Sequence, residues 1–316
     1  MSISNAFRSL LIGVLITAGC NASVAADRIT VVLSDNSAPY LAAADAFLSL
    51  FGNGPSGSTK VEIILAPALV AAKVPLPEDN ALIVTVGLAA TEAVLRGNGD
   101  VPVLSTLIPK IAYESLACDA SHKSAGRRCS AIYLDQPLDR QLKLIQAALP
   151  GKRQIGIVFG PSSEKLLPEL MEQVPGHNLS LTYQVIHDVS QLYPALETVL
   201  ASSDVLLTLP DGAVLNSSSA RSMLISAYRA QVPVVAFSEN YVKAGATLGV
   251  FSTPEQQGRQ AAEVATAALA ASVASLPSPQ YPKYFSVKIN EQVARSLGLS
   301  IPDEQTLRQR LAELRK

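Results

Sequence analysis

Small polar residues and aspartates occupy four loops, each of which follows a predicted strand. The loops are Ser34–Pro39, Gly87–Thr91, Gly160–Ser163 and Pro210–Gly212. In open α/β sheets, ligands bind beyond the carboxyl ends of the strands, where loops lead into helix N-termini. Hydroxyl groups and backbone N–H groups at such positions suit a carboxylate or another polar head group. We therefore expect these loops to line a ligand site.

The same residues have a second interpretation. Asp35 and Asp211 could pair with a ligand ammonium, but Asp35, Ser162 and Asp211 could equally cap the helices that follow them. Residue types alone leave both alternatives open. The presence of such loops in both halves of the chain is the stronger indication of a ligand site.

No catalytic motif accompanies these loops. The sequence contains no G-x-x-x-x-G-K-[ST], H-E-x-x-H or G-x-S-x-G string. His122, His177 and His187 lack the spacing of zinc ligands. Residues Gly52–Gly57 match G-x-G-x-x-G, but they follow a predicted helix and contain Pro55, which predicts a surface turn. We expect a protein that is not an enzyme and that has no cofactor or metal, with a hydrolase or racemase as the weakest alternative.

The N-terminus has the pattern of a secretory signal. Arg8 precedes the apolar run Leu10–Ala18, and the small residues Val24–Ala26 follow it. The run is too short to cross a bilayer core of about 30 Å as a helix. We predict a signal peptide over residues 1–26 and a periplasmic protein. Thr17–Cys20 also resembles a lipobox, so lipidation of Cys20 is the alternative.

Two further cysteines, Cys118 and Cys129, flank a polar loop. In an oxidising compartment this pattern predicts a disulfide. Closing such a short loop would contribute about 2–3 kcal/mol. Two unpaired buried thiols are the alternative.

Short β-branched runs alternate with Ala- and Leu-rich helical stretches from Asp27 onward. Several runs are apolar throughout, which is typical of parallel strands that are buried on both faces. The expected strands are Ile29–Leu33, Val61–Leu65, Leu82–Val86, Val101–Ser105, Ala131–Leu134, Ile155–Phe159, Ser180–Ile186, Val205–Leu209, Val232–Phe237, Ala246–Phe251 and Lys283–Ile289. This alternation predicts an α/β protein with two Rossmann-like lobes, divided near Asp135–Pro137.

Composition excludes other classes. The chain is 48% hydrophobic and only 16% charged, so it is not disordered. Lys and Arg number 25 against 26 Asp and Glu, which leaves no basic excess for binding nucleic acid. Aromatic residues make up 5% and Trp is absent, which argues against a sugar site of stacked indoles.

Three ordered segments and the tail carry a family resemblance. They are Leu82–Thr91 (LIVTVGLAAT), Ser130–Pro161, Val232–Ala262 and Asn290–Pro302 (NEQVARSLGLSIP). In this order they resemble the periplasmic substrate-binding proteins of ABC transporters with the type I two-lobe fold. The similar branch includes tryptophan- and tyrosine-type binders.

The resemblance implies two lobes joined by a three-segment hinge. The segments would lie near residue 135, at 239–243 and at 275–283. The first lobe would contain residues 27–134 plus 242–276, and the second would contain residues 135–241 plus 283–316. Matching the cleft loops of the family nominates the ligand-binding residues Ser37, Ala38, Gly87, Leu88, Thr91, Ser162, Asp211 and Glu239. Tyr40 is added as a nearby aromatic residue.

The expected function is capture of a small polar solute, such as an amino acid, and its delivery to an ABC permease and ATPase in the inner membrane. The protein would be a monomer, and its lobes would close over the ligand. The alternative is a periplasmic sensor or assembly protein that keeps the fold without transport.

Overall fold

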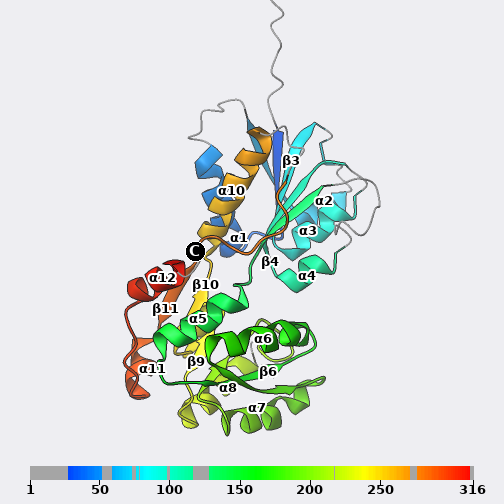
Figure 1. The fold of residues 1–316 in the computed structure, drawn as a ribbon. Coiled ribbons are helices and arrows are strands. Elements are labelled where there is room, and N and C mark those ends of the chain that lie inside the picture. Colours follow the sequence, from blue (N-terminus) through cyan, green and yellow to red (C-terminus); the bar gives the residue numbers. More distant parts are fainter. Residues whose placement is uncertain are drawn as a thin grey trace, which may run out of the picture.

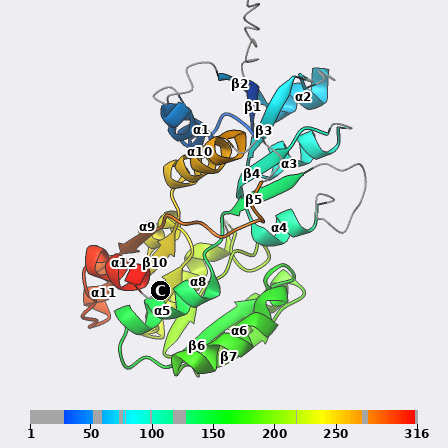
Figure 2. The same ribbon diagram turned by 45° about the horizontal axis from the view of Figure 1, so that its top comes forward.

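The computed structural model describes residues 28–51, 59–72, 76–77, 79–97, 100–116, 128–216, 218–270 and 276–313. The predicted signal peptide, including Cys20, lies outside these residues, and so does Cys118. The described chain forms two α/β lobes, one above the other in Figures 1 and 2. The expected fold class is confirmed.

The first lobe is built on a five-stranded parallel sheet in the order β2-β1-β3-β4-β5. The strands are β1 (Arg28–Leu33), β2 (Lys60–Leu65), β3 (Asn80–Val86), β4 (Val103–Ile108) and β5 (Cys129–Tyr133). The helices are α1 (Ala38–Phe51), α2 (Ala66–Ala72), α3 (Leu88–Leu95), α4 (Lys110–Glu114) and α10 (Pro254–Ala270).

Alternation along the central strands explains the layers of this lobe. Ile29, Val31 and Leu33 point to one face and pack with α1 and α10. Val32 and Ile83 point to the other face and pack with α2 and α3. Both faces of the sheet are therefore covered, which is why its strands are apolar throughout.

The second lobe is built on a six-stranded sheet in the order β11-β10-β9-β8-β6-β7, in which only the β10–β11 pair is antiparallel. The strands are β6 (Gln154–Phe159), β7 (Ser180–Val185), β8 (Val205–Leu207), β9 (Val234–Ala236), β10 (Leu248–Phe251) and β11 (Ser286–Ile289). The α-helices are α5 (Leu138–Ala148), α6 (Leu167–Gln173), α7 (Leu192–Leu200), α8 (Ser219–Arg229), α9 (Glu239–Ala244), α11 (Glu291–Ser296) and α12 (Glu304–Glu313). Short 3-10 helices are η1 (Ser163–Leu166), η2 (Val174–His177) and η3 (Val189–Gln191).

Two apolar clusters cover the faces of the second sheet. One contains residues of α5, α6 and α12, and the other contains residues of α7, α8 and α9. The buried stripe of α5 includes Leu142 and Ile145, as its apolar spacing predicts.

The second crossing between the lobes differs from the sequence prediction. The assignment of residues 242–276 to the first lobe is wrong for residues 242–251, because β10 pairs with β9 and β11 of the second sheet. Leu248 and Val250 are buried in the core of that lobe. The chain crosses after Phe251, and not at 239–243, and it continues as α10 on the first sheet.

The other two crossings lie close to each other. The first follows β5 at residues 134–137, and the third leads from the end of α10 to β11. The third segment runs beside β5, because the Tyr133 N–H donates to the Gln280 carbonyl and the Gln280 N–H donates to the Ala131 carbonyl. The crossing segments that form the hinge therefore lie side by side.

Candidate functional site

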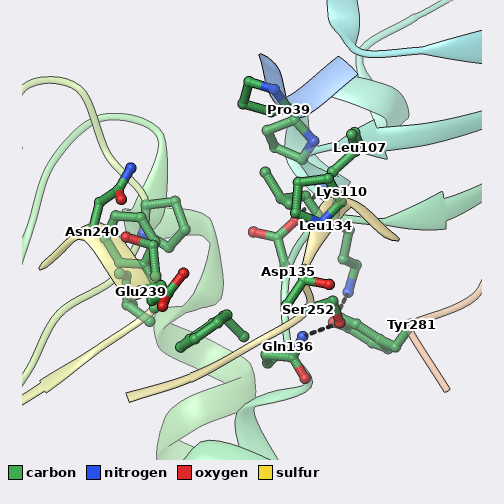
Figure 3. A pocket seen from close by; sticks show the side chains of 18 of the residues that line it. Pro39, Leu107, Lys110, Leu134, Asp135, Gln136, Glu239, Asn240, Ser252 and Tyr281 are labelled. Atoms are coloured by element: carbon green, nitrogen blue, oxygen red, sulfur yellow. Dashed lines mark hydrogen bonds between the residues drawn. The ribbon is translucent and has the colours of Figure 1, made fainter. Parts of the chain in front are cut away.

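A cavity of about 520 Å³ lies between the lobes. Its lining residues come from the first lobe, the second lobe and the crossing segments. Figure 3 shows Glu239 and Asn240 on one side and Pro39, Leu107 and Asp135 on the other. A cavity of this volume is within the range of small-molecule sites.

The first-lobe wall includes Ser37 and Tyr40, both of which the sequence analysis nominated. The Ser37 N–H donates to an Asp35 carboxylate oxygen at 2.7 Å, which shapes the turn before α1. Tyr40 packs against Gly87, which has a positive φ of 92°. A Cβ at Gly87 would overlap the Tyr40 ring and the Ser34 hydroxyl, so only glycine fits this close approach.

A β-bulge places Leu107 in the same wall. The pairing of β4 with β5 shifts register between Thr106 and Ile108. Leu107 has a φ of 52°, in the left-handed region that side chains rarely adopt. Bulges beside binding sites commonly redirect a side chain, and here the redirected residue contacts the cavity.

A polar cluster lies where the first lobe meets the hinge. The Lys110 ammonium donates to the Tyr281 hydroxyl at 3.1 Å and lies 3.7 Å from the Glu169 carboxylate of the second lobe. Burial acts to lower the pKa of Lys110, but the Tyr281 hydroxyl and the Glu169 charge raise it on balance. Asp135 accepts a hydrogen bond from the backbone N–H of Lys110. Burial raises the pKa of the Asp135 carboxyl, and this hydrogen bond offsets the shift only in part.

The second-lobe wall begins at the carboxyl end of β9. Phe237, Ser238, Glu239 and Asn240 all line the cavity. Ser238 caps α9, because its hydroxyl accepts the Tyr241 N–H. Glu239 also pairs with Lys243, with 2.9 Å between Oε1 and Nζ, and its side chain is 42% exposed. Glu239 therefore lies at the rim, where solvent screens its charge.

Gln136 connects the crossing segments at the base of the cavity. Its amide Nε2 donates to the Ser252 hydroxyl at 2.9 Å, and that hydroxyl donates to the Tyr284 carbonyl (Figure 3 shows the Gln136–Ser252 bond). Its Oε1 accepts a hydrogen bond from Arg140, which also donates to the Pro282 carbonyl. One buried side chain thus contacts residues of the second crossing directly and those of the third through its partners.

The structure brings only part of the nominated set to this cavity. Ser37, Tyr40 and Glu239 line it, whereas Ala38, Gly87, Leu88, Thr91, Ser162 and Asp211 are not among its lining residues. Ligand contact by any of the nine stays a prediction.

Thr91 and Asp211 do not line the cavity and are instead hydrogen-bonded to other groups of the protein. Thr91 is fully buried, and its hydroxyl bonds the Gly87 carbonyl and lies 2.9 Å from the Thr85 hydroxyl. Asp211 accepts the N–H groups of Ser162 and Ser163 at 3.0 and 2.7 Å. Asp211 therefore binds the first N–H groups of η1, which precedes it in the chain, and does not cap the helix that follows it.

Sequence reasoning missed Lys110, Asp135, Gln136 and Tyr281 as lining residues. Lys110 and Asp135 each follow a strand of the first sheet, so the rule of strand ends could have found them. Tyr281 reaches the site through the third crossing, and its position depends on a segment distant in sequence.

Neither a metal site nor a membrane-spanning helix is evident in the described part of the chain. The described residues contain no group of three or more His, Cys, Asp or Glu placed to hold a metal ion. None of the helices found there is both long enough and apolar enough to cross a bilayer.

Comparison with known proteins identifies a matching family. A family model described as ABC transporter substrate binding protein matches residues 67–310. No curated protein matches the chain.

Solved structures with the same fold include three with high coverage. A ligand-free, open substrate-binding protein with adhesive properties from Clostridium difficile has a TM-score of 0.68 and 17% identity, covering 88% of this chain and 97% of that one. The ABC domain in complex with L-Trp from Streptococcus pneumoniae has a TM-score of 0.61 and 15% identity, covering 90% and 98%. A conserved domain protein from Vibrio cholerae has a TM-score of 0.59 and 20% identity, also covering 90% and 98%.

Proposed function

The chain belongs to the ABC transporter substrate-binding protein family, and from this premise we propose that it captures a small organic solute between its lobes. The cavity at the lobe junction carries the proposal, because both lobes and the hinge contribute to its lining. Closing the lobes would bury a bound solute from both sides. The solute would be released unchanged to a permease.

We also propose that the protein acts outside the cytoplasm after removal of residues 1–26. Asp27 would then be the first residue of the mature chain. The intact mass of the protein purified from its own cells separates this outcome from lipidation at Cys20. A mass that includes residues 1–26 would contradict export by this signal.

Solute capture is tested by thermal unfolding and native mass spectrometry against amino acids, amines, organic acids, sugars and short peptides. We expect a one-to-one complex and recovery of the solute without chemical change. The absence of any complex across these classes would contradict the proposed function.

A cavity-filling variant ties binding to this site. Leu134 lines the cavity and is 39% exposed, so Leu134→Trp should fill space without disturbing the core. Leu50→Trp is the matched control, because Leu50 is 43% exposed on α1 and is not a lining residue. We expect loss of binding only in Leu134→Trp, and equal binding by both variants would place the ligand elsewhere.

A further inference from the structure

The charged side chains that line the cavity differ in whether a protein group already pairs with them. Among its described lining residues, Lys110 is the one Lys or Arg, whereas Asp135 and Glu239 are acids. The Lys110 ammonium already faces the Glu169 carboxylate and the Tyr281 hydroxyl. A ligand carboxylate would have to compete with Glu169 for this cation.

The anion sites of the strand-end loops are also occupied by the protein. The Asp211 carboxylate receives the Ser162 and Ser163 N–H groups and the Ser163 hydroxyl, at 3.0, 2.7 and 2.9 Å. A Cβ at Gly160 would overlap this carboxylate, so the loop is closed tightly around it. In the first lobe, the Ser34 hydroxyl accepts the Ala90 N–H at the start of α3. These four donors, which could have held an anionic head group, are therefore already bonded within the protein.

Asp135 differs from Lys110 and Asp211 in the partners of its charged group. One of its oxygens accepts the backbone N–H of Lys110, and none of the ion pairs found among the described residues includes it. It lies on the first crossing, and its side chain lies on the cavity side in Figure 3. The Lys110 charge acts on Asp135 without an ion-pair contact, and Asp135 is half-buried. A carboxylate that is partly removed from water without a cation in contact is unfavourable. A cation in the cavity would supply that partner.

The other side chains that line the cavity suit the uncharged part of an organic cation. Aromatic rings of Tyr40, Phe237, Phe251 and Tyr281 line the cavity. Ring faces attract cations, and aromatic cages are a known means of binding substituted ammonium groups. Leu107 and further aliphatic residues provide apolar surface for a hydrocarbon body.

We propose that the cavity selects an organic amine, with a cationic nitrogen paired to Asp135 and an apolar body against the aromatic walls, in preference to an amino acid or a carboxylic acid. This inference rests on the proposed function, because it assumes that the cavity is the solute site. It narrows the solute to one charge class. Glu239 at the rim would add attraction for the same charge.

Matched triplets of compounds test the charge class. Each triplet shares one apolar body and differs only in its charged groups: tryptamine, L-tryptophan and indole-3-propionate; phenethylamine, L-phenylalanine and 3-phenylpropionate; isoamylamine, L-leucine and 4-methylpentanoate. Calorimetry with the mature protein should show the amine binding most tightly in at least one triplet. An amino acid or acid that binds more tightly than its amine would overturn the inference and leave the proposed function standing.

Failure of all nine compounds would also overturn the amine class for these bodies. The proposed function would then be decided separately, by the wider solute panel described above. The two failures are therefore distinguishable.

Substitution of the anionic partner tests the assignment to Asp135. Asp135→Asn keeps the shape and an acceptor for the Lys110 N–H, and it should weaken amine binding about ten- to a hundred-fold, the range for hydrogen bonds to charged groups. Asp139→Asn is the matched control, because Asp139 pairs with Lys143 outside the cavity. Unchanged amine affinity in a folded Asp135→Asn protein would overturn the assignment.

A second variant keeps the test independent of Asp135. Glu169→Gln removes the carboxylate that faces Lys110 and leaves the Lys110 charge unbalanced beside the ligand. Amine affinity should fall and carboxylate affinity should rise. A rise in amine affinity would contradict the proposed charge balance.

Discussion

Asp211 is an acid whose carboxylate serves the second lobe itself. It is buried, and its two oxygens receive hydrogen bonds from the backbone N–H groups of Ser162, Ser163 and Ala213. These bonds join the loop after β6 to the loop after β8. Asp211 therefore holds the two loops of the second lobe at a fixed separation.

Asp211→Asn should destabilise the protein, because an amide nitrogen would face backbone donors that need an acceptor. A buried group left unsatisfied costs about 1–3 kcal/mol. Urea unfolding measures the loss. Asp35→Asn is the control, since Asp35 is exposed and its hydrogen bonds come from the N–H and side chain of Ser37, so its loss should be smaller. Equal losses would show that burial of Asp211 is not the cause.

Asp135→Asn should have a different effect on stability, and one that depends on pH. Burial raises the pKa of Asp135 in the folded protein, so folding favours its protonated form. The contribution of Asp135 to stability is therefore greatest below the ordinary carboxyl pKa of about 4, and it is lost as pH rises through the raised pKa.

Asn cannot ionise, so the variant escapes this loss. We expect Asp135→Asn to unfold at a higher temperature than the parent protein at neutral pH, with the difference shrinking as pH falls toward about 4. Thermal unfolding of both proteins across this range is the measurement. A difference that does not change with pH would contradict the raised pKa. Greater stability together with lost binding would be typical of a functional residue.

At the scale of elements, α10 completes the helical layer on one face of the first sheet. It packs against α1, and Gly258 on α10 lies so close to α1 that a Cβ there would overlap the Ala43 carbonyl. The contact is between backbones, so no side-chain movement can relieve it. The glycine therefore sets the spacing of the two helices.

Gly258→Ala should destabilise the protein although alanine favours helices by about 1 kcal/mol. Forcing an extra carbon into a packed contact costs about 1–3 kcal/mol. Gly176→Ala is the matched control, because nothing lies within 4 Å of a Cβ at that position. Chemical unfolding should show a loss only for Gly258→Ala. A gain in both variants would mean that α10 moves away from α1 at little cost.

The disulfide prediction belongs to β5, which begins at Cys129. A bond to Cys118 should make the intact protein lighter by two hydrogens than the reduced form. Reduction should lower the free energy of unfolding by about 2–3 kcal/mol. Alkylation of both cysteines without a reducing agent would contradict the bond.

The alternation of apolar runs and helical stretches was enough to predict the strands and the two-lobe fold. It was not enough to place β10, because a short apolar run does not show which sheet it joins. The strand-end rule selected the loop of Ser37, and the family resemblance selected Glu239; both residues line the cavity. The strand-end rule could not show that the Asp211 carboxylate accepts the N–H groups of Ser162 and Ser163, or that Tyr281 reaches the site from a distant segment.

At the scale of the whole molecule, the lobes are coupled through the hydrogen bonds of Gln136. Gln136 is buried, and it contacts Ser252 of the second crossing and Arg140, which in turn bonds Pro282 of the third. Any change in the angle between the lobes must move chain segments that these bonds hold together.

Gln136→Leu should both destabilise the protein and change the distribution of lobe angles. The substitution removes the acceptor of a buried guanidinium and the donor to Ser252, and each such loss costs about 1–3 kcal/mol. Small-angle scattering should show a changed radius of gyration. Ser252→Ala, which removes only the hydroxyl link, should have a smaller effect. An unchanged radius in Gln136→Leu would contradict a role in the hinge.

The position of α10 in the chain has a consequence for how the protein is made. The sheet of the first lobe is complete at Tyr133, but the helix that packs on α1 starts only at Pro254. The ribosome must therefore synthesise the second lobe as far as β10 before the first lobe can acquire its missing layer. The lobe that is begun first stays incomplete until α10 has been made, and one apolar face of its sheet stays uncovered throughout that interval.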